Sequence, residues 1–174
     1  MSEIKKNLTT DCGMFGIWDK KYFEKITSYE EWENEFIENE DIEKNIEQST
    51  FVPIYIHTDG TFQFKVKYEG NLDEREEKNI INKSKEYLFK TEGESYLSGI
   101  EYIESNVDKD RCLKLDLEKG IYSIQMNTIA WDNEPDAFLP NGDVSENALS
   151  DCVVIIKKID KIDKDYKKDV ETFK

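Results

Sequence analysis

Residues that could support nucleophilic or metal chemistry are few and scattered in this sequence. His57 is the only histidine, so any Ser-His-Asp or Cys-His arrangement must use it, and it stands beside a turn sequence at 58–60. The three cysteines, Cys12, Cys112 and Cys152, lie far apart and form no Cys-x-x-Cys pair. This set makes a poor zinc site and a poor disulfide framework. We expect no catalytic residues, and thiols that are reduced and mostly buried.

Phosphate-binding and cation-binding motifs give no stronger signal. Neither GxxxxGK[ST] nor GxGxxG occurs, so a nucleotide site has no support. The segment from Asp132 to Asp143 holds oxygen ligands, but its spacing is not that of an EF-hand and Gly142-Asp143 suits a plain turn equally well. Among 39 acidic residues, a chosen carboxylate pair says nothing about glycoside chemistry. We predict no metal, no cofactor and no enzymatic activity, and the sequence leaves open whether the loop at 132–143 binds a cation.

Acidic side chains dominate the chemistry that this sequence can offer. The net charge is −15 and the pI is about 4.6. Residues 24–48 hold ten acids against two lysines, and residues 131–151 hold six acids and no Lys or Arg, so these two segments carry nearly all of the net charge. Nucleic acids and acidic membranes require clustered Lys and Arg, so neither is expected as a partner. A concentrated negative field instead steers a basic protein to its site.

The candidate partner-binding residues come from both acidic segments. Tyr29, Trp32, Trp131 and Phe138 lie within them and could anchor an interface, although a core position is favoured for Trp32. The alternative for each segment is a solvated face that keeps the protein soluble. The candidate residues are Glu30, Glu31, Glu35, Glu38, Glu40, Asp41, Asp132, Glu134, Asp136 and Asp143.

Hydrophobic spacing in the first half predicts a strand, a helical region and a hairpin. Residues 12–18 form a short apolar strand whose two glycines indicate a bulge or a close backbone approach. A capping pattern at Ser28 starts a helical region near 29–47, with Tyr29, Trp32 and Phe36 on one face and Glu31, Glu35 and Glu38 on the other. Near Asn39 the helical spacing of the apolar residues is interrupted, which predicts either a second short helix or a kinked continuation of the first. Residues 51–57 and 61–68 read as a hairpin joined by Asp59-Gly60, with one wet face on its second arm.

The second half predicts more strands, one further helix and a helical tail. We expect a helix near 72–90, strands at 95–104, 113–117, 121–131 and 152–159, and a long loop at 132–150. The last of these strands should be buried on both faces. In the tail, apolar residues step by three or four and predict an amphipathic helix at about 160–173, which docks on its own domain or contacts a partner. These residues are Ile159, Ile162, Tyr166, Val170 and Phe173.

These elements predict one α+β domain spanning residues 1–174. Its core would be a mainly antiparallel sheet or open β-sandwich of about six to eight strands, with two or three peripheral helices. The longest apolar run is Cys152 to Ile156, too short to cross a membrane, and the N-terminus lacks the apolar region of a signal peptide. We therefore expect a cytoplasmic protein that binds no membrane.

Three passages, Asp11 to Asp19, the segment through Asp59-Gly60, and Glu118 to Ile124, together resemble small β-rich bacterial immunity proteins of polymorphic toxin systems. The resemblance implies an acidic, cytosolic single domain that blocks one cognate toxin, and it implies no catalytic residues. A nuclease site is positive because it holds phosphates, so an acidic face can occupy it. We therefore expect a non-enzymatic inhibitor of a basic protein, specifically an immunity protein against a nuclease-like toxin.

The alternative function is a small-ligand or carbohydrate-binding β module. Tyr and Trp side chains at strand ends could stack on sugar rings, and Asp and Asn could bind hydroxyl groups. A concave aromatic pocket favours this alternative, whereas a flat or convex acidic ridge favours the inhibitor. The sequence gives neither the oligomeric state nor the relative placement of the two acidic segments.

Overall fold

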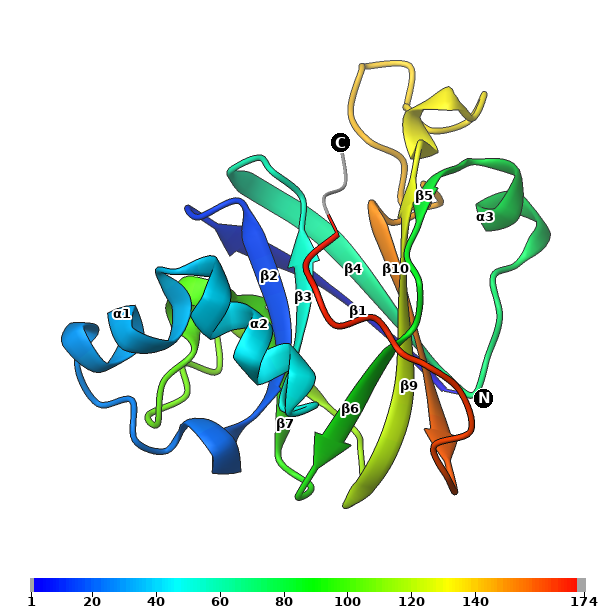
Figure 1. Cartoon of the computed structure of the whole chain (residues 1–174). Helices are drawn as coiled ribbons and strands as arrows, with labels where there is room; N and C mark the ends of the chain where they lie inside the picture. Colours follow the sequence, from blue (N-terminus) through cyan, green and yellow to red (C-terminus); the bar gives the residue numbers. More distant parts are fainter. Residues whose placement is uncertain (1, 172–174) are drawn as a thin grey trace.

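Two β-sheets form the body of the molecule in the computed structural model, which describes residues 2–171 (Figure 1). The α+β class and the open sandwich are confirmed, with ten strands where six to eight were expected. The strands are β1 (Glu3–Thr10), β2 (Met14–Asp19), β3 (Phe51–Tyr55), β4 (Gly60–Tyr68), β5 (Ile80–Lys83), β6 (Tyr87–Thr91), β7 (Ser95–Gly99), β8 (Cys112–Leu115), β9 (Gly120–Ile129) and β10 (Cys152–Ile159).

The helices are short and lie at the margins of the two sheets. Two of them, α1 and α2, lie together on the left in Figure 1, and α3 lies on the right. Among the described residues, no helix is long and apolar enough to span a membrane. The α-helices are α1 (Tyr29–Phe36), α2 (Asn39–Glu47) and α3 (Glu74–Lys78), and the 3-10 turns are η1 (Lys20–Phe23), η2 (Ile100–Tyr102) and η3 (Trp131–Asn133).

The larger sheet has the order β1-β4-β10-β9-β5, with β6 also paired to β9, and the smaller has the order β3-β2-β7-β8. Every pairing is antiparallel except that of β10 with β4. Residues 152–156 of β10 are buried on both faces, as their apolar run predicts, because Val154 packs in the core between the sheets while Val153 and Ile155 pack in a second cluster on the other face. Side chains from both sheets, such as Phe15 and Ile17 of β2 and Phe64 and Val66 of β4, share one hydrophobic core.

The predicted hairpin at 51–68 is wrong, because its two arms belong to different sheets. Strand β3 pairs with β2, whereas β4 pairs with β1 and β10. The connection begins at His57, which has a left-handed φ of 67°, and the backbone N–H groups of Ile56 and His57 both donate to the carbonyl of Gly13 at 3.0 Å. Asp59-Gly60 therefore belongs to a crossover between sheets, a use that the local turn sequence does not distinguish from a hairpin.

The close backbone approach predicted for the apolar segment at 12–18 is confirmed. At Gly16 of β2, a Cβ atom would lie 2.1 Å from the ring of Phe51 on the neighbouring strand β3. The ring of Phe51 is fully buried, so it has no free space to move into. Glycine at this position lets β3 pack its aromatic ring directly on the backbone of β2.

The predicted helix at 72–90 is also wrong, because only five of its residues are helical. Asp73 and Glu76 form a capping box that starts α3, and the helix ends at Lys78. Two strands, β5 and β6, follow and both pair with β9. In β6, Tyr87, Leu88 and Phe89 are all buried, so the apolar residues that suggested one helical face fill a strand instead. Tertiary pairing here prevails over local spacing.

The predicted C-terminal helix is wrong for residues 160–171, which contain no helical turn, and Phe173 lies outside the described residues. The tail instead crosses the front of the molecule in an irregular path in Figure 1. The backbone N–H of Lys167 donates to the carbonyl of Glu86 at 2.9 Å, and the side chain of Tyr166 is buried, with a relative exposure of 7%. Ile162, from the same predicted stripe, is 54% exposed. Only part of the stripe therefore docks on the sheets.

Candidate functional site

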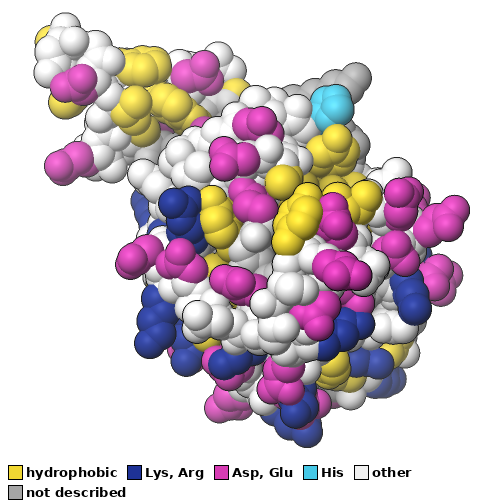
Figure 2. Space-filling view, turned by 90° about the vertical axis from the view of Figure 1, so that its left-hand side faces the viewer, with side chains coloured by type: hydrophobic (Ala, Val, Ile, Leu, Met, Phe, Trp, Pro, Cys, Tyr) yellow, Lys and Arg dark blue, Asp and Glu magenta, His cyan; other side chains and the backbone are white. Residues whose placement is uncertain are grey.

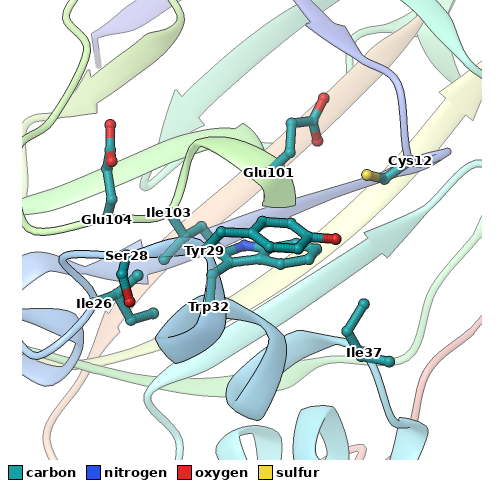
Figure 3. Close-up of a pocket in the computed structure, with 9 residues that line it drawn as sticks. All are labelled: Cys12, Ile26, Ser28, Tyr29, Trp32, Ile37, Glu101, Ile103 and Glu104. Carbon is teal, nitrogen blue, oxygen red and sulfur yellow. The ribbon is translucent and has the colours of Figure 1, made fainter.

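A hollow of about 440 Å³ lies between α1, the turn that follows β1, and η2. A second hollow of about 450 Å³ continues it toward α2 and β3, and the two share Cys12, Trp32 and Ile37. We call the two hollows together the α1 groove. Figure 3 shows the first hollow, in which α1 supplies one wall and η2 and the β1–β2 turn supply the other. Its lining residues are Cys12, Ile26, Ser28, Tyr29, Trp32, Ile37, Glu101, Ile103 and Glu104.

An aromatic pair forms the floor of the first hollow. The rings of Tyr29 and Trp32 stack with centroids 5.8 Å apart and planes 17° apart. Trp32 is buried, as its favoured core position predicts, and its Nε1 donates to the carbonyl of Ile100 at 2.8 Å. Tyr29 is 69% exposed and Ile37 is 52% exposed. The groove therefore offers one aromatic face and one aliphatic side chain to solvent on a rigid support.

The charges that line the α1 groove are all negative among the residues that the structure describes. Glu101 and Glu104 line the first hollow and Glu43 lines the second. The carboxylate of Glu101 accepts hydrogen bonds from the Thr10 hydroxyl at 3.0 Å and from the backbone N–H of Asp11 at 2.7 Å. These bonds fix the carboxylate without neutralising it. Sequence reasoning missed Glu101 and Glu104 because they lie in the segment 95–104, which was predicted only as a strand.

Two of the candidate acids on α1 stabilise the helix rather than stand free. The carboxylate of Glu31 accepts from the backbone N–H and the hydroxyl of Thr27, both at 2.7 Å, and these bonds lower the pKa of Glu31. Glu35 pairs with Lys25 and accepts from Asn45 Nδ2 at 3.0 Å. Burial tends to raise the pKa of Glu35, but its bonds to Lys25 and Asn45 outweigh it and lower that pKa. The predicted outward row at positions 31, 35 and 38 is therefore wrong at Glu35, which faces α2.

The other acids of this segment are less constrained. Glu30, Glu38 and Glu40 are exposed and Asp41 is half-buried. Of the ten acids at 24–48, only Glu24 and Glu35 form an ion pair with a residue in the described range. Figure 2 shows the face that carries α1 and α2, where acidic side chains and some Lys or Arg side chains lie around a central group of hydrophobic ones. The negative field at this face is therefore largely uncompensated within the chain.

The second acidic segment forms a projecting arm, residues 131–149, at the top of Figure 1. Figure 2 is turned about the vertical axis, so the arm stays at the top, where hydrophobic and acidic side chains appear without Lys or Arg. The predicted loop is confirmed, with one bridge between Phe138 and Val144. Phe138, Leu139 and Val144 are each about half exposed.

Arg75 of α3 holds the base of the arm. Its guanidinium donates to both carboxylate oxygens of Glu134 at 3.0 and 2.6 Å, and to the carbonyl of Asn147 at 3.0 Å. The candidate residue Glu134 is thus committed within the chain. Asp132, Asp136 and Asp143 are exposed, and Asp143 closes a tight turn with Asn141. Among the described residues, no group of three or more His, Cys, Asp or Glu side chains could hold a metal ion.

The three cysteines are free, but their predicted burial is wrong for one of them. Cys112 and Cys152 are buried, whereas Cys12 is exposed at the edge of the α1 groove. Desolvation raises the pKa of the Cys12 thiol to about 11, and the carboxylate of Glu101 adds to the shift. Cys12 lies in the turn between β1 and β2 and not in the apolar strand that follows it. Its apolar sequence neighbours therefore led to the wrong prediction that it is buried.

A thiol reagent should label one cysteine per native chain. Cys12 should react slowly at neutral pH and about tenfold faster per pH unit as the pH approaches its raised pKa, because the thiolate is the nucleophile. Glu101→Gln should speed the reaction, since it removes a negative charge beside the thiol. Mass spectrometry after timed labelling measures this, with Cys12→Ser as the control. Native-state labelling of Cys112 or Cys152 would contradict the burial described here.

Comparisons with known proteins give a likeness in fold. No family model matches the chain, and no curated protein matches it. One solved structure, described as Crocagin biosynthetic gene J, is 12% identical with a TM-score of 0.54, covering 90% of this chain and 96% of its own. A second is 12% identical with a TM-score of 0.52 and the same coverage. The chain is thus similar in fold to ComJ, inhibitor of the DNA degrading activity of NucA, from Bacillus subtilis.

Proposed function

We propose that this chain is a non-enzymatic inhibitor that binds a basic protein through the α1 groove and the arm, as an immunity protein binds a nuclease-like toxin. The observation that carries the proposal is the coincidence of two features in the same places. The exposed side chains Tyr29, Ile37, Phe138 and Val144 lie in the two segments that hold nearly all of the net charge. Interfaces combine buried apolar anchors with complementary charge, and this surface supplies both.

A nuclease is the class of partner that best matches this surface. Its active site must be positive to hold phosphates, so an acidic face can occupy the site and exclude the nucleic acid. ComJ, which shares the fold, is an inhibitor of a DNA-degrading protein. The carboxylates that would meet the partner are Glu30, Glu38, Glu40, Asp41, Asp132, Asp136 and Asp143, with Glu31, Glu35 and Glu134 in supporting positions.

The test uses the product of the gene adjacent to the one for this chain as the candidate partner. The triple variant Glu30→Gln, Glu38→Gln, Glu40→Gln should associate with it several-fold more slowly at low salt, because charge steering sets the association rate. The difference should shrink as ionic strength rises through about 0.15 M, where screening acts over about 8 Å. Stopped-flow or interferometry at several salt concentrations measures the rates.

The matched control removes the same charge elsewhere. Glu74, Glu77 and Asp163 are also exposed, and they lie outside the two acidic segments. The variant Glu74→Gln, Glu77→Gln, Asp163→Asn should associate at close to the wild-type rate. If both triple variants slow association equally, the effect belongs to net charge and not to a directed face. Glu31 and Glu35 are left unchanged in this experiment, because their bonds stabilise α1.

A second candidate function is a carbohydrate-binding module, and one observation favours it. The exposed ring of Tyr29 forms the floor of a concave hollow, as a sugar-stacking platform would. Ser28 and two glutamates are the polar side chains beside it, apart from Cys12. A titration with neutral mono- and oligosaccharides, followed by NMR shifts of the groove amides, separates this candidate from the inhibitor.

A further inference from the structure

The hollow over Tyr29 has the geometry of a site for one flat side chain. Tyr29 lies on Trp32, and the indole of Trp32 is held by the carbonyl of Ile100. The carboxylate of Glu33, on the same helix, raises the pKa of the Tyr29 hydroxyl. The ring of Tyr29 therefore rests on a buried, hydrogen-bonded indole and presents its other face to the hollow.

Charge defines what can occupy this platform. Glu101 and Glu104 line the same hollow, and no Lys or Arg is among its lining residues in the described range. In Figure 3 both carboxylates lie across the hollow from α1, which carries Tyr29. A cationic occupant between them gains attraction from both carboxylates, a neutral one gains none, and an acidic one is repelled. The occupant must also tolerate the apolar wall formed by Ile26, Ile37 and Ile103.

Arginine satisfies all three demands at once. Its planar guanidinium stacks on an aromatic face, its five N–H groups can serve two carboxylates, and its aliphatic stem suits an apolar wall. Lysine offers a compact point charge that cannot stack in this way. The same chain already uses the arrangement nearby. Arg111 lies 4.9 Å from the centroid of the Tyr102 ring, donates to its hydroxyl at 2.6 Å and pairs with Asp108.

We propose that the hollow over Tyr29 binds an arginine side chain of the basic partner, stacked on Tyr29 and paired with Glu101 and Glu104. This inference rests on the proposed function, because the partner supplies the arginine. The inference adds the type of residue that the partner must present and the side chains of this chain that bind it.

The test is an NMR titration of the uniformly labelled full chain with N-acetyl-L-argininamide. Amide shifts should saturate and concentrate at residues 28–37 and 101–104. The citrulline analogue has nearly the same shape and no charge, and it should bind at least tenfold more weakly. Tyr29→Leu keeps an apolar side chain and removes the ring, and it should weaken argininamide binding at least fivefold. Glu104→Gln should weaken it similarly, whereas Glu77→Gln, an exposed acid on α3, should leave it unchanged.

Three outcomes would overturn the inference. These are equal binding of the citrulline analogue, shifts spread over the whole acidic surface, and wild-type binding by both Tyr29→Leu and Glu104→Gln. Because Glu104 is exposed, its variant is informative even if Tyr29→Leu destabilises the fold. The two levels of the account fail separately. If the adjacent-gene product binds and Tyr29→Leu leaves its affinity unchanged, the arginine site is wrong while the proposed function stands. If argininamide titrates the hollow but that protein does not bind, the proposed function is what fails.

Discussion

Glu76→Gln should lower the free energy of unfolding by about 3–5 kcal/mol, the usual cost of removing one partner from a buried ion pair. Glu76 lies on the buried side of α3, and its side chain is 1% exposed. Its two carboxylate oxygens contact Lys65 Nζ at 2.9 Å and Lys67 Nζ at 2.5 Å. Glutamine would leave two nearly buried ammonium groups side by side, with only the more distant carboxylates of Glu3, at 3.5 Å from Lys65, and Asp73, at 3.8 Å from Lys67, as counter-charges. Chemical denaturation at pH 7 measures the loss, and Glu74→Gln, exposed on the same helix, should change it by less than about 0.5 kcal/mol.

The difference between wild type and Glu76→Gln should depend on pH in a defined direction. Burial acts to raise the pKa of Glu76, but hydrogen bonds from Lys67 and Lys65 outweigh it and hold that pKa below its ordinary value. A carboxyl with a lowered pKa stabilises the fold above its unfolded pKa, about 4.3, and loses that effect as pH falls through the folded value. The wild-type advantage should therefore be complete at pH 7 and shrink below about pH 4. An advantage that is small at pH 7, or independent of pH down to 2, would contradict the buried pair.

Removal of residues 166–174 should destabilise the chain by several kcal/mol. Tyr166 is buried, and exposing its site forfeits roughly 1.5–3 kcal/mol. The hydroxyl of Tyr87 donates to the carbonyl of Asp169 at 2.6 Å, and Tyr87 is fully buried, so losing this acceptor costs about 1–3 kcal/mol more. Thermal unfolding of the shortened chain measures the sum.

A single substitution distinguishes the observed tail from a docked amphipathic helix. The helical stripe makes Ile162 and Tyr166 equivalent, whereas the structure exposes the first and buries the second. Ile162→Ser should therefore change stability by less than about 0.5 kcal/mol, and Tyr166→Ser should reproduce much of the truncation. If the two substitutions lower the stability equally, the result would support a docked amphipathic helix over the observed tail.

The sequence predicted the elements whose pattern is local. Helix α1 begins at the Ser28 cap, and Ile42 and Ile46 lie buried on a second short helix. Residues 152–156 of β10 are apolar because both faces of the strand are covered there. The sequence-based prediction failed for elements whose structure depends on pairing with strands that are distant in the sequence. Nothing within 51–68 indicates that β3 and β4 enter different sheets, and the apolar residues of 80–90 suit a helix face and paired strands equally well.

The site divides in the same way. Local composition identified the acidic segments and the position of Tyr29 and Trp32, because charge and aromatic content can be counted. The opposite wall of the α1 groove comes from two other segments. One is η2, more than 60 residues after α1 in the sequence, and the other is the β1–β2 turn, which precedes α1. Glu101, Glu104 and the exposed Cys12 reach the groove only through the pairing of β2 with β7.

Inhibition of nuclease activity is the most direct measurement of the central claim. The adjacent-gene product is purified and its activity on DNA and RNA is assayed with increasing amounts of this chain at low salt. The account predicts that activity falls to background near one molar equivalent, and that Glu30→Gln, Glu38→Gln, Glu40→Gln requires more protein while the control at 74, 77 and 163 does not. Full nuclease activity in the presence of excess, demonstrably bound protein would contradict the account, because the acidic face would then bind without occupying the positive site.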